Sequence, residues 1–176
     1  MGVPFADTSV YNIPEGLGDE QVLFLSDILL TSFEVSVLNG RVSPGDTISV
    51  VGAGPIGLAV ILPARLFSPG KIIAIDLADA RLKKAKEFGA DVTINNTAGD
   101  PVAQVMSMTV ALGVDVAIEA VGVPASFELC ADLVEPGGRV ANGGVHEHPA
   151  TRHRRSSASG MSPSRPRRRR QPARSR

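Results

Sequence analysis

The stretch Thr47-Ile-Ser-Val-Val-Gly-Ala-Gly-Pro-Ile-Gly57 decides the fold of this chain. A short run rich in β-branched residues leads directly into the pattern G-x-G-x-x-G, and an apolar helical stretch follows it. A strand, a glycine-rich turn and a helix in this order are typical of a βαβ unit that binds a dinucleotide. Gly52 permits the tight turn, Gly54 lets the backbone approach a pyrophosphate, and Gly57 allows the helix to pack closely on the strand.

The residues after this loop add a second cofactor signal. Phosphates would meet the unpaired N–H groups and the positive dipole end of the helix that begins at Pro55 and Ile56. The next predicted strand, Lys71–Ile75, ends in Asp76, 19 residues after the last glycine of the loop. An acid at this distance accepts hydrogen bonds from the adenosine ribose hydroxyls and repels a 2′-phosphate, which favours NAD over NADP. The alternative is that Asp76 only caps the helix that begins near Ala78.

Short β-branched runs alternate with longer helical stretches through the rest of this region. The predicted strands are Thr47–Val51, Lys71–Ile75, Val92–Ile94, Val116–Ile118 and Arg139–Ala141, and the predicted helices cover about 55–67, 78–88, 101–111 and 124–134. This alternation predicts an α/β fold, a Rossmann-type doubly wound parallel sheet with helices on both faces. The sheet is expected to be incomplete, because the chain changes character where a sixth strand would follow. Pro63 predicts a kink or an early end of the first of these helices.

The chain divides into three regions by composition. Residues 1–40 read as an extended lead-in and a connecting helix, with Asp19 as N-cap and an end near Asn39. Residues 41–150 form the dinucleotide-binding domain, and residues 151–176 form a tail. We expect no apolar run long enough to cross a bilayer and no secretory signal. Cys130 is the single cysteine. These features predict a cytoplasmic protein with no membrane partner.

The tail differs sharply in charge from the rest of the chain. Residues 151–176 contain ten arginines, no lysine and no acidic residue, so that the preceding 150 residues carry a net charge of −10. Almost no hydrophobic side chains remain in the tail, which predicts disorder. The run Arg167 to Arg170 could contact nucleic-acid phosphates. We do not expect a nucleic-acid partner, because the loss of pattern after Ala150 favours a gene read in a shifted frame.

Several blocks occur in the order and spacing of a known family. They are Ser26-Asp27-Ile-Leu-Leu-Thr31, Val42-Ser-Pro-Gly-Asp46, Val51-Gly-Ala-Gly-Pro-Ile-Gly57, Asp115-Val-Ala-Ile-Glu-Ala-Val-Gly122 and Glu135-Pro-Gly-Gly-Arg-Val140. On these residues, the stretch from about Val3 to His146 resembles zinc-dependent alcohol dehydrogenases of the medium-chain dehydrogenase family. The resemblance implies hydride transfer between an alcohol and NAD, an aldehyde or ketone as the other substrate, and a catalytic zinc. It also implies a homo-oligomer that pairs through the edge of the sheet.

The resemblance places further residues beside the cofactor. They are Arg81 near the adenosine ribose, Ala120, Val121 and Gly122 after the fourth strand, and Gly144 and Val145 at the nicotinamide end. For Arg81, a solvated charge on a helix surface is an equal alternative. A nucleotide-binding module without enzymatic activity is the alternative function for the chain as a whole.

Asp27 is the candidate metal ligand. It interrupts an apolar helix, where a buried carboxylate is costly unless paired, and Asp oxygens suit zinc in an open catalytic site. The resemblance implies that the matching position supplies a zinc ligand in some family branches. The family's other ligands have no match, because no cysteine precedes Cys130 and no histidine precedes His146. We therefore expect the zinc only in a full-length relative, with an exposed helix position or a cap as the alternative for Asp27. For this chain we expect no catalytic residue and no turnover.

The remaining candidates receive structural interpretations. His146, His148 and His153 are expected to be solvated, since no cysteine or acid converges on them. Cys130 is expected to be a buried core thiol. Glu119 closes a strand and is expected to hydrogen-bond locally, with no catalytic role.

Overall fold

The computed structural model of the chain describes residues 2–146. The predicted tail, the place expected for a sixth strand, His148 and His153 lie outside the described residues.

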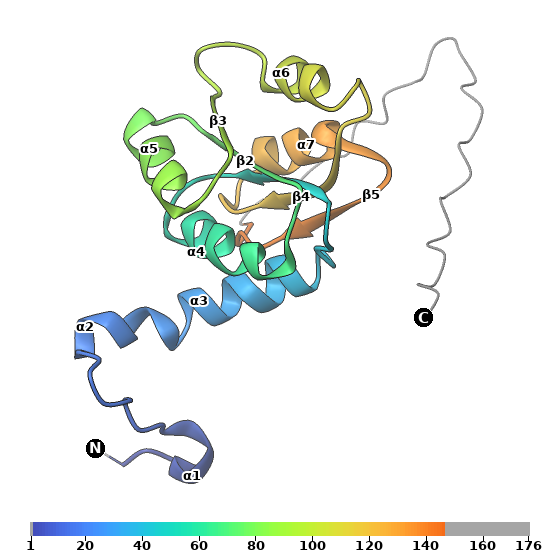
Figure 1. Cartoon of the computed structure of the whole chain (residues 1–176). Coiled ribbons are helices and arrows are strands. Elements are labelled where there is room, and N and C mark those ends of the chain that lie inside the picture. Colours follow the sequence, from blue (N-terminus) through green and yellow to red (C-terminus); the bar gives the residue numbers. More distant parts are fainter. Residues whose placement is uncertain (1, 147–176) are drawn as a thin grey trace, which may run out of the picture.

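Within residues 2–146, five parallel strands form one sheet in the order β3-β2-β1-β4-β5 (Figure 1). The strands are β1 (Thr47–Val51), β2 (Lys71–Asp76), β3 (Val92–Asn95), β4 (Val114–Glu119) and β5 (Val134–Asn142). The chain first adds strands on one side of β1 and then returns to its other side, so the boundary between β1 and β4 is a topological switch point. Val51 pairs with Ile75 on one side and with Glu119 on the other. The ends of the three central strands therefore meet at one edge.

Helices cover both faces of the sheet (Figure 1). They are α4 (Pro55–Ala64) and α5 (Asp79–Phe88) on one face, and α6 (Pro101–Met108) and α7 (Pro124–Leu133) on the other. The predicted doubly wound α/β fold is thus confirmed for the described residues. Two hydrophobic clusters result, one between each face and its helices.

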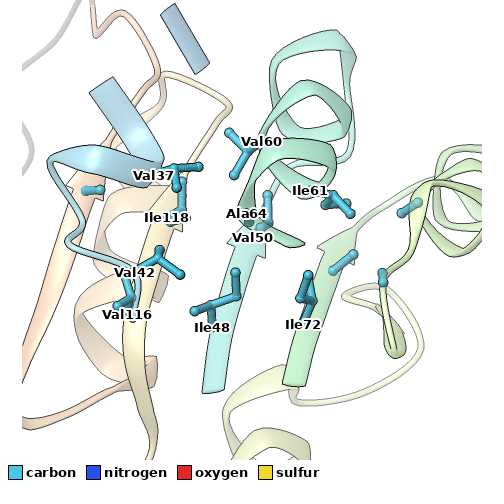
Figure 2. Close-up of a cluster of buried hydrophobic side chains, with 14 of the residues drawn as sticks. Val37, Val42, Ile48, Val50, Val60, Ile61, Ala64, Ile72, Val116 and Ile118 are labelled. Carbon is cyan, nitrogen blue, oxygen red and sulfur yellow. The ribbon is translucent and has the colours of Figure 1, made fainter. Parts of the chain in front are cut away.

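Alternate residues of each strand feed the two clusters. Ile48 and Val50 of β1 point to the face that α4 covers, where they lie near Val60 (Figure 2). Ile73 and Ile75 of β2 belong to the opposite cluster with side chains of α6 and α7. Full burial of one such aliphatic side chain contributes about 1.5–3 kcal/mol. Both faces of the central strands are buried, which explains why these strands are rich in apolar residues and do not alternate regularly with polar ones.

The boundaries of two helices follow from backbone chemistry. α4 ends at Ala64, one residue after Pro63, and the chain continues as the 3₁₀ turn η3 (Arg65–Phe67). The predicted early end is confirmed. α6 ends at Met108, earlier than the predicted residue 111, because Val110 and Ala111 adopt positive φ values of 55° and 59°. A left-handed backbone cannot continue a right-handed helix.

The predicted helix of the first region is divided into shorter segments. After the short α1 (Ala6–Ser9), these are α2 (Asp19–Val22), η1 (Leu23–Leu25), α3 (Ile28–Thr31) and the π-helical η2 (Ser32–Leu38). Asp27 interrupts the series with φ −142° and ψ −68°. The N-cap is Gly18 and not Asp19, and the side chain of Gln21 accepts the Gly18 N–H at 2.9 Å. The predicted cap is therefore wrong by one residue.

The helical run Asp19–Leu38 is 20 residues long and apolar enough, by length and composition, to cross a membrane. The expectation that no run reaches this length is therefore wrong. One such helix is weak evidence for a membrane span, because a helix that packs on a protein core has the same composition. Ser32, Ser36 and Val37 near its end are buried in the protein.

Candidate functional site

The glycine loop connects β1 to α4 at the switch point. Gly52 has φ +97°, and a Cβ on it would lie 3.1 Å from the Ala120 carbonyl oxygen. A Cβ on Gly57 would collide with the carbonyl oxygen of Gly52, so the helix packs on the turn through bare backbone. A Cβ on Gly54, by contrast, would meet nothing within 4 Å. The protein's own packing requires glycine at 52 and 57, whereas at Gly54 it leaves open space for a ligand.

The N-terminus of α4 faces this open space without a capping side chain. Gly54 is the N-cap and Pro55 is the first helical residue. The N–H groups of Ile56 and Gly57 have no partner within the helix, because the first intrahelical bond is donated by Leu58 to Gly54. Unpaired N–H groups and the positive end of the helix dipole together favour an anion.

Asp76 lies at the end of β2, and its side chain is nearly buried, with 5% exposed. Its Oδ2 accepts the N–H of Ala53 in the glycine loop at 2.7 Å, and its Oδ1 accepts the N–H of Ala78 at 2.9 Å. Ala78 is the N-cap of α5. The capping interpretation of Asp76 is therefore part of its role, and the same carboxylate also holds the loop. Both oxygens retain free lone pairs for further donors.

A pocket of about 340 Å³ opens beside this carboxylate. Its wall includes Gly52, Asp76 and Arg81, residues that follow β3, and Ser126 of α7. Arg81 is 63% exposed, and its Nη1 lies 3.7 Å from Asp76 Oδ1. The guanidinium thus lines the pocket while most of it remains in contact with solvent. The wall of the pocket is largely apolar and carries the charged side chains of Asp76 and Arg81, a composition typical of small-molecule sites.

The segments predicted around the nicotinamide end lie together at the ends of β4 and β5. Ala120 donates its N–H to the carbonyl of Val51 at 2.9 Å, and Val121 is half exposed. Gly122 has φ +89°, and a Cβ on it would collide with the carbonyl of Val145. A Cβ on Gly144 would collide with the N–H of Gly122. The two segments are therefore in backbone contact beside the glycine loop.

Asp27 does not share this site. Its side chain is exposed and its Oδ1 accepts the hydroxyl of Thr31 at 2.8 Å. Asp27 is the N-cap residue of α3, although its carboxylate caps no backbone N–H. Within residues 2–146, no three His, Cys, Asp or Glu side chains are arranged to hold a metal ion. The donor set of the described residues therefore does not fit a catalytic zinc, which needs three protein ligands.

His146 occupies a different place from the one predicted. Its side chain is only 16% exposed, and its Nε2 lies 3.2 Å from Glu119 Oε2 and 2.8 Å from Asn142 Oδ1. The expectation of a solvated His146 is wrong, because the chain turns back after β5 and returns the imidazole to the end of β4. In the sequence, an acid that closes an apolar strand indicates that donors lie nearby, but it does not identify His146 as one of them.

Two other structural expectations are confirmed. Glu119 hydrogen-bonds locally to Val121, Gly122 and Ser126. Cys130 is a free, fully buried thiol on α7. Burial raises the pKa of the Cys130 thiol well above its usual range, and the nearby charge of Glu119 raises it further. Cys130 is accordingly a packing residue and not a nucleophile.

Comparison with known proteins places the chain among dehydrogenases. Residues 55–162 match the family described as zinc-binding dehydrogenase. An alcohol dehydrogenase of Cupriavidus necator is 43% identical over 149 residues, which are 85% of this chain and 40% of that protein. Zinc-dependent alcohol dehydrogenase 2 from Streptococcus pneumonia, solved in its apo form, superposes with a TM-score of 0.81 at 42% identity. That match covers 86% of this chain and 43% of the solved one.

One relative is named for its cofactor NADP, and each of these relatives is longer than this chain. The NADP-dependent isopropanol dehydrogenase of Thermoanaerobacter brockii is 32% identical, over 78% of this chain and 39% of that protein. The chain thus spans about 40% of the length of the curated relatives that it matches.

Proposed function

Because this chain belongs to the zinc-binding dehydrogenase family, we propose that its residues 41–150 are the NAD-binding domain of an alcohol dehydrogenase. One observation carries the proposal. The open space at Gly54, the carboxylate of Asp76 and the loop after β4 lie along the same edge of the sheet, at its switch point. An extended dinucleotide lying across this edge would meet all three.

Each element has a distinct task in this proposal. The N–H groups of Ile56 and Gly57 receive the pyrophosphate, and the missing side chain of Gly54 admits it. Asp76 accepts the ribose hydroxyls through its free lone pairs, while Arg81 covers the exposed side of the adenosine pocket. Asp76 also selects NAD, because a 2′-phosphate would lie against a carboxylate.

The nicotinamide half lies beside the segments Ala120–Gly122 and Gly144–Val145. Their close backbone contact supports a rigid platform there, and Val121 is exposed enough to contact the ring. Bound NAD supplies the ring that accepts or donates hydride. In this proposal the described residues 2–146 bind and orient that ring, and none of them is assigned as an acid, base or nucleophile for the transfer.

The substrates and the assembly of a whole enzyme are proposed from the relatives, of which this chain matches about 40%. We propose an alcohol and its aldehyde or ketone as substrates, and a homo-oligomer as the assembly, both from family membership. Asp27 would serve as one zinc ligand only where other donors complete the set. A cytoplasmic location stays a prediction that the reduced, buried Cys130 supports.

Thermal unfolding with NAD or NADP at equal concentration tests the proposal. NAD at a hundredfold excess over its dissociation constant should stabilise the folded chain by about 2.7 kcal/mol. NADP should stabilise it less. A larger effect of NADP would refute the role of Asp76, and no effect of either would refute cofactor binding. The purified chain should show no alcohol-dependent formation of NADH, and measurable turnover would contradict the assignment as a cofactor domain.

A further inference from the structure

Glu119 is a fully buried carboxylate outside the adenosine pocket and without a part in the cofactor contacts described above. Its Oε1 accepts the N–H groups of Val121 at 2.8 Å and Gly122 at 2.9 Å. The hydroxyl of Ser126 lies 2.6 Å from the same oxygen. One oxygen atom therefore holds the backbone of the loop that follows β4.

The other oxygen of Glu119 faces His146. Nε2 of His146 lies between two acceptors, Oε2 of Glu119 and Oδ1 of Asn142, so this nitrogen carries a hydrogen and donates it. The ring also meets Phe127 edge-on, with centroids 6.0 Å apart. Two strand ends and one helix thus fix the position of the imidazole.

The backbone draws the same two segments together. The N–H of Gly143 donates to the carbonyl oxygen of Glu119 at 2.8 Å. A Cβ on Gly144 would collide with the Glu119 carboxylate, and a Cβ on Gly122 would collide with the Val145 carbonyl. The carboxylate is therefore enclosed by the two segments that are proposed to receive the nicotinamide.

We propose that Glu119 and His146 form a buried clasp that shapes the nicotinamide end of the site. Glu119 is a positioning residue for the loop Ala120–Gly122, and His146 holds that carboxylate while it closes the turn after β5. The clasp acts through backbone and not through contact with the ring. This inference rests on the proposed function, because it assigns the two segments to the nicotinamide half of the dinucleotide.

Three variants of the full chain distinguish an effect of the clasp on the nicotinamide end from a general loss of stability. His146→Phe keeps an aromatic ring against Phe127 but removes the donor to Glu119. His146→Gln restores an N–H donor on a flexible side chain. Glu87→Gln is the control for a substitution on the surface outside the clasp, because Glu87 is exposed on α5 and pairs only with Lys84 among the described residues.

Calorimetric binding of NAD and of ADP-ribose, which lacks the nicotinamide ring, provides the first readout. His146→Phe should weaken NAD binding about tenfold, the effect of one lost hydrogen bond to a charged group, and leave ADP-ribose within about twofold. His146→Gln should recover most of the NAD affinity, and Glu87→Gln should change neither. Equal losses for both ligands in His146→Phe would overturn the proposal in favour of a merely structural role. Unchanged NAD affinity would overturn it as well.

Amide hydrogen exchange without ligand provides the second readout. The N–H groups of Val121 and Gly122 should exchange at least about tenfold faster in His146→Phe, while amides in β1 stay protected. Unchanged exchange at these two amides would refute the clasp. If the unaltered chain binds neither ligand, the proposed function is wrong, and the exchange rates alone still decide whether His146 orders this loop.

Discussion

The Oδ2 atom of Asp76 lies 2.7 Å from the backbone nitrogen of Ala53, a residue 23 positions earlier in the chain. The acid that closes β2 therefore fixes the glycine loop that follows β1. The same side chain lines the pocket that we propose for adenosine and accepts the N–H of Ala78. The proposed selection of the cofactor and the stability of the loop therefore depend on the same carboxylate.

Replacing Asp76 should affect both properties. Asp76→Gly removes the acceptor of two backbone N–H groups and should lower the free energy of unfolding by about 1–3 kcal/mol. It should also narrow the difference between stabilisation by NAD and by NADP. Asp76→Asn retains one oxygen and should narrow the cofactor difference with a smaller loss of stability. Urea denaturation and thermal shifts with each cofactor measure the two effects. An unchanged preference for NAD in both variants would contradict the role of the charge.

The second and third glycines of the loop, Gly54 and Gly57, should respond differently to the same added methyl group. Gly54→Ala places a Cβ in open space, so stability should change by less than about 1 kcal/mol, the range of helix-terminal effects. NAD binding should nevertheless fall by about tenfold or more, because the methyl group occupies the proposed path of the pyrophosphate. Gly57→Ala forces the helix away from the Gly52 carbonyl and should destabilise the fold by about 1–3 kcal/mol. Calorimetry and urea denaturation on both variants distinguish these outcomes, and a Gly54→Ala protein that binds NAD normally would refute the phosphate site.

Cys130 should be protected from thiol reagents in the folded chain. Burial first, and then the charge of Glu119, raise the pKa of this thiol, so almost no thiolate forms at pH 8. A chromogenic disulfide should therefore modify Cys130 on the order of a hundredfold more slowly in the folded chain than in the chain unfolded by urea. Rapid modification of the folded protein would show that α7 opens locally.

Two acids should change stability with opposite signs. Burial, together with the negative charges of Asp115 and Asp46, raises the pKa of Glu135. Its charged form therefore penalises the folded state above that pKa, and the penalty disappears as the pH falls to about 4 and below. Glu135→Gln should raise the free energy of unfolding at pH 7 by about a few tenths of a kcal/mol, a small effect because solvent screens this partly exposed charge. It should have little effect at pH 4.

The pKa of Glu87 is shifted in the opposite direction to that of Glu135. The hydrogen bond from Lys84 lowers the pKa of this exposed carboxyl, so its charged form favours the folded state. That contribution is present above the ordinary pKa of a glutamate and is lost as the pH falls through the lowered value. Glu87→Gln should slightly lower stability at pH 7. Thermal unfolding at pH 7 and pH 4 checks both variants, and equal signs at pH 7 would contradict this assignment.

Metal removal should leave the chain unchanged. Asp27 has no partner ligands arranged around it among residues 2–146, so a chelator should not alter the unfolding temperature. Zinc titration should show no stoichiometric binding in roughly the micromolar range, because a catalytic zinc site needs three protein ligands in place. Tight equimolar binding would require a ligand set that the described residues do not form.

The sequence determined those features that depend on local patterns. The strand, loop and helix around Gly52–Gly57 could be identified because glycine positions and β-branched runs act over a few residues. The order and type of the elements of the sheet followed from the same alternation. The division of the first predicted helix into short segments could not be predicted in this way. An acid such as Asp27 in an apolar run is equally compatible with a continuous helix and a broken one.

Tertiary structure alone decided which polar groups meet at the carboxyl ends of β4 and β5. Glu119 and His146 lie 27 residues apart in the chain, and neither signals the other in sequence. They meet because β4 and β5 are parallel, Glu119 pairs with Asn142, and the turn after β5 folds back over the end of β4. Side-chain patterns specify which residues face the core. The register of parallel strands, set through a helical crossover, specifies which polar groups meet at the sheet edge.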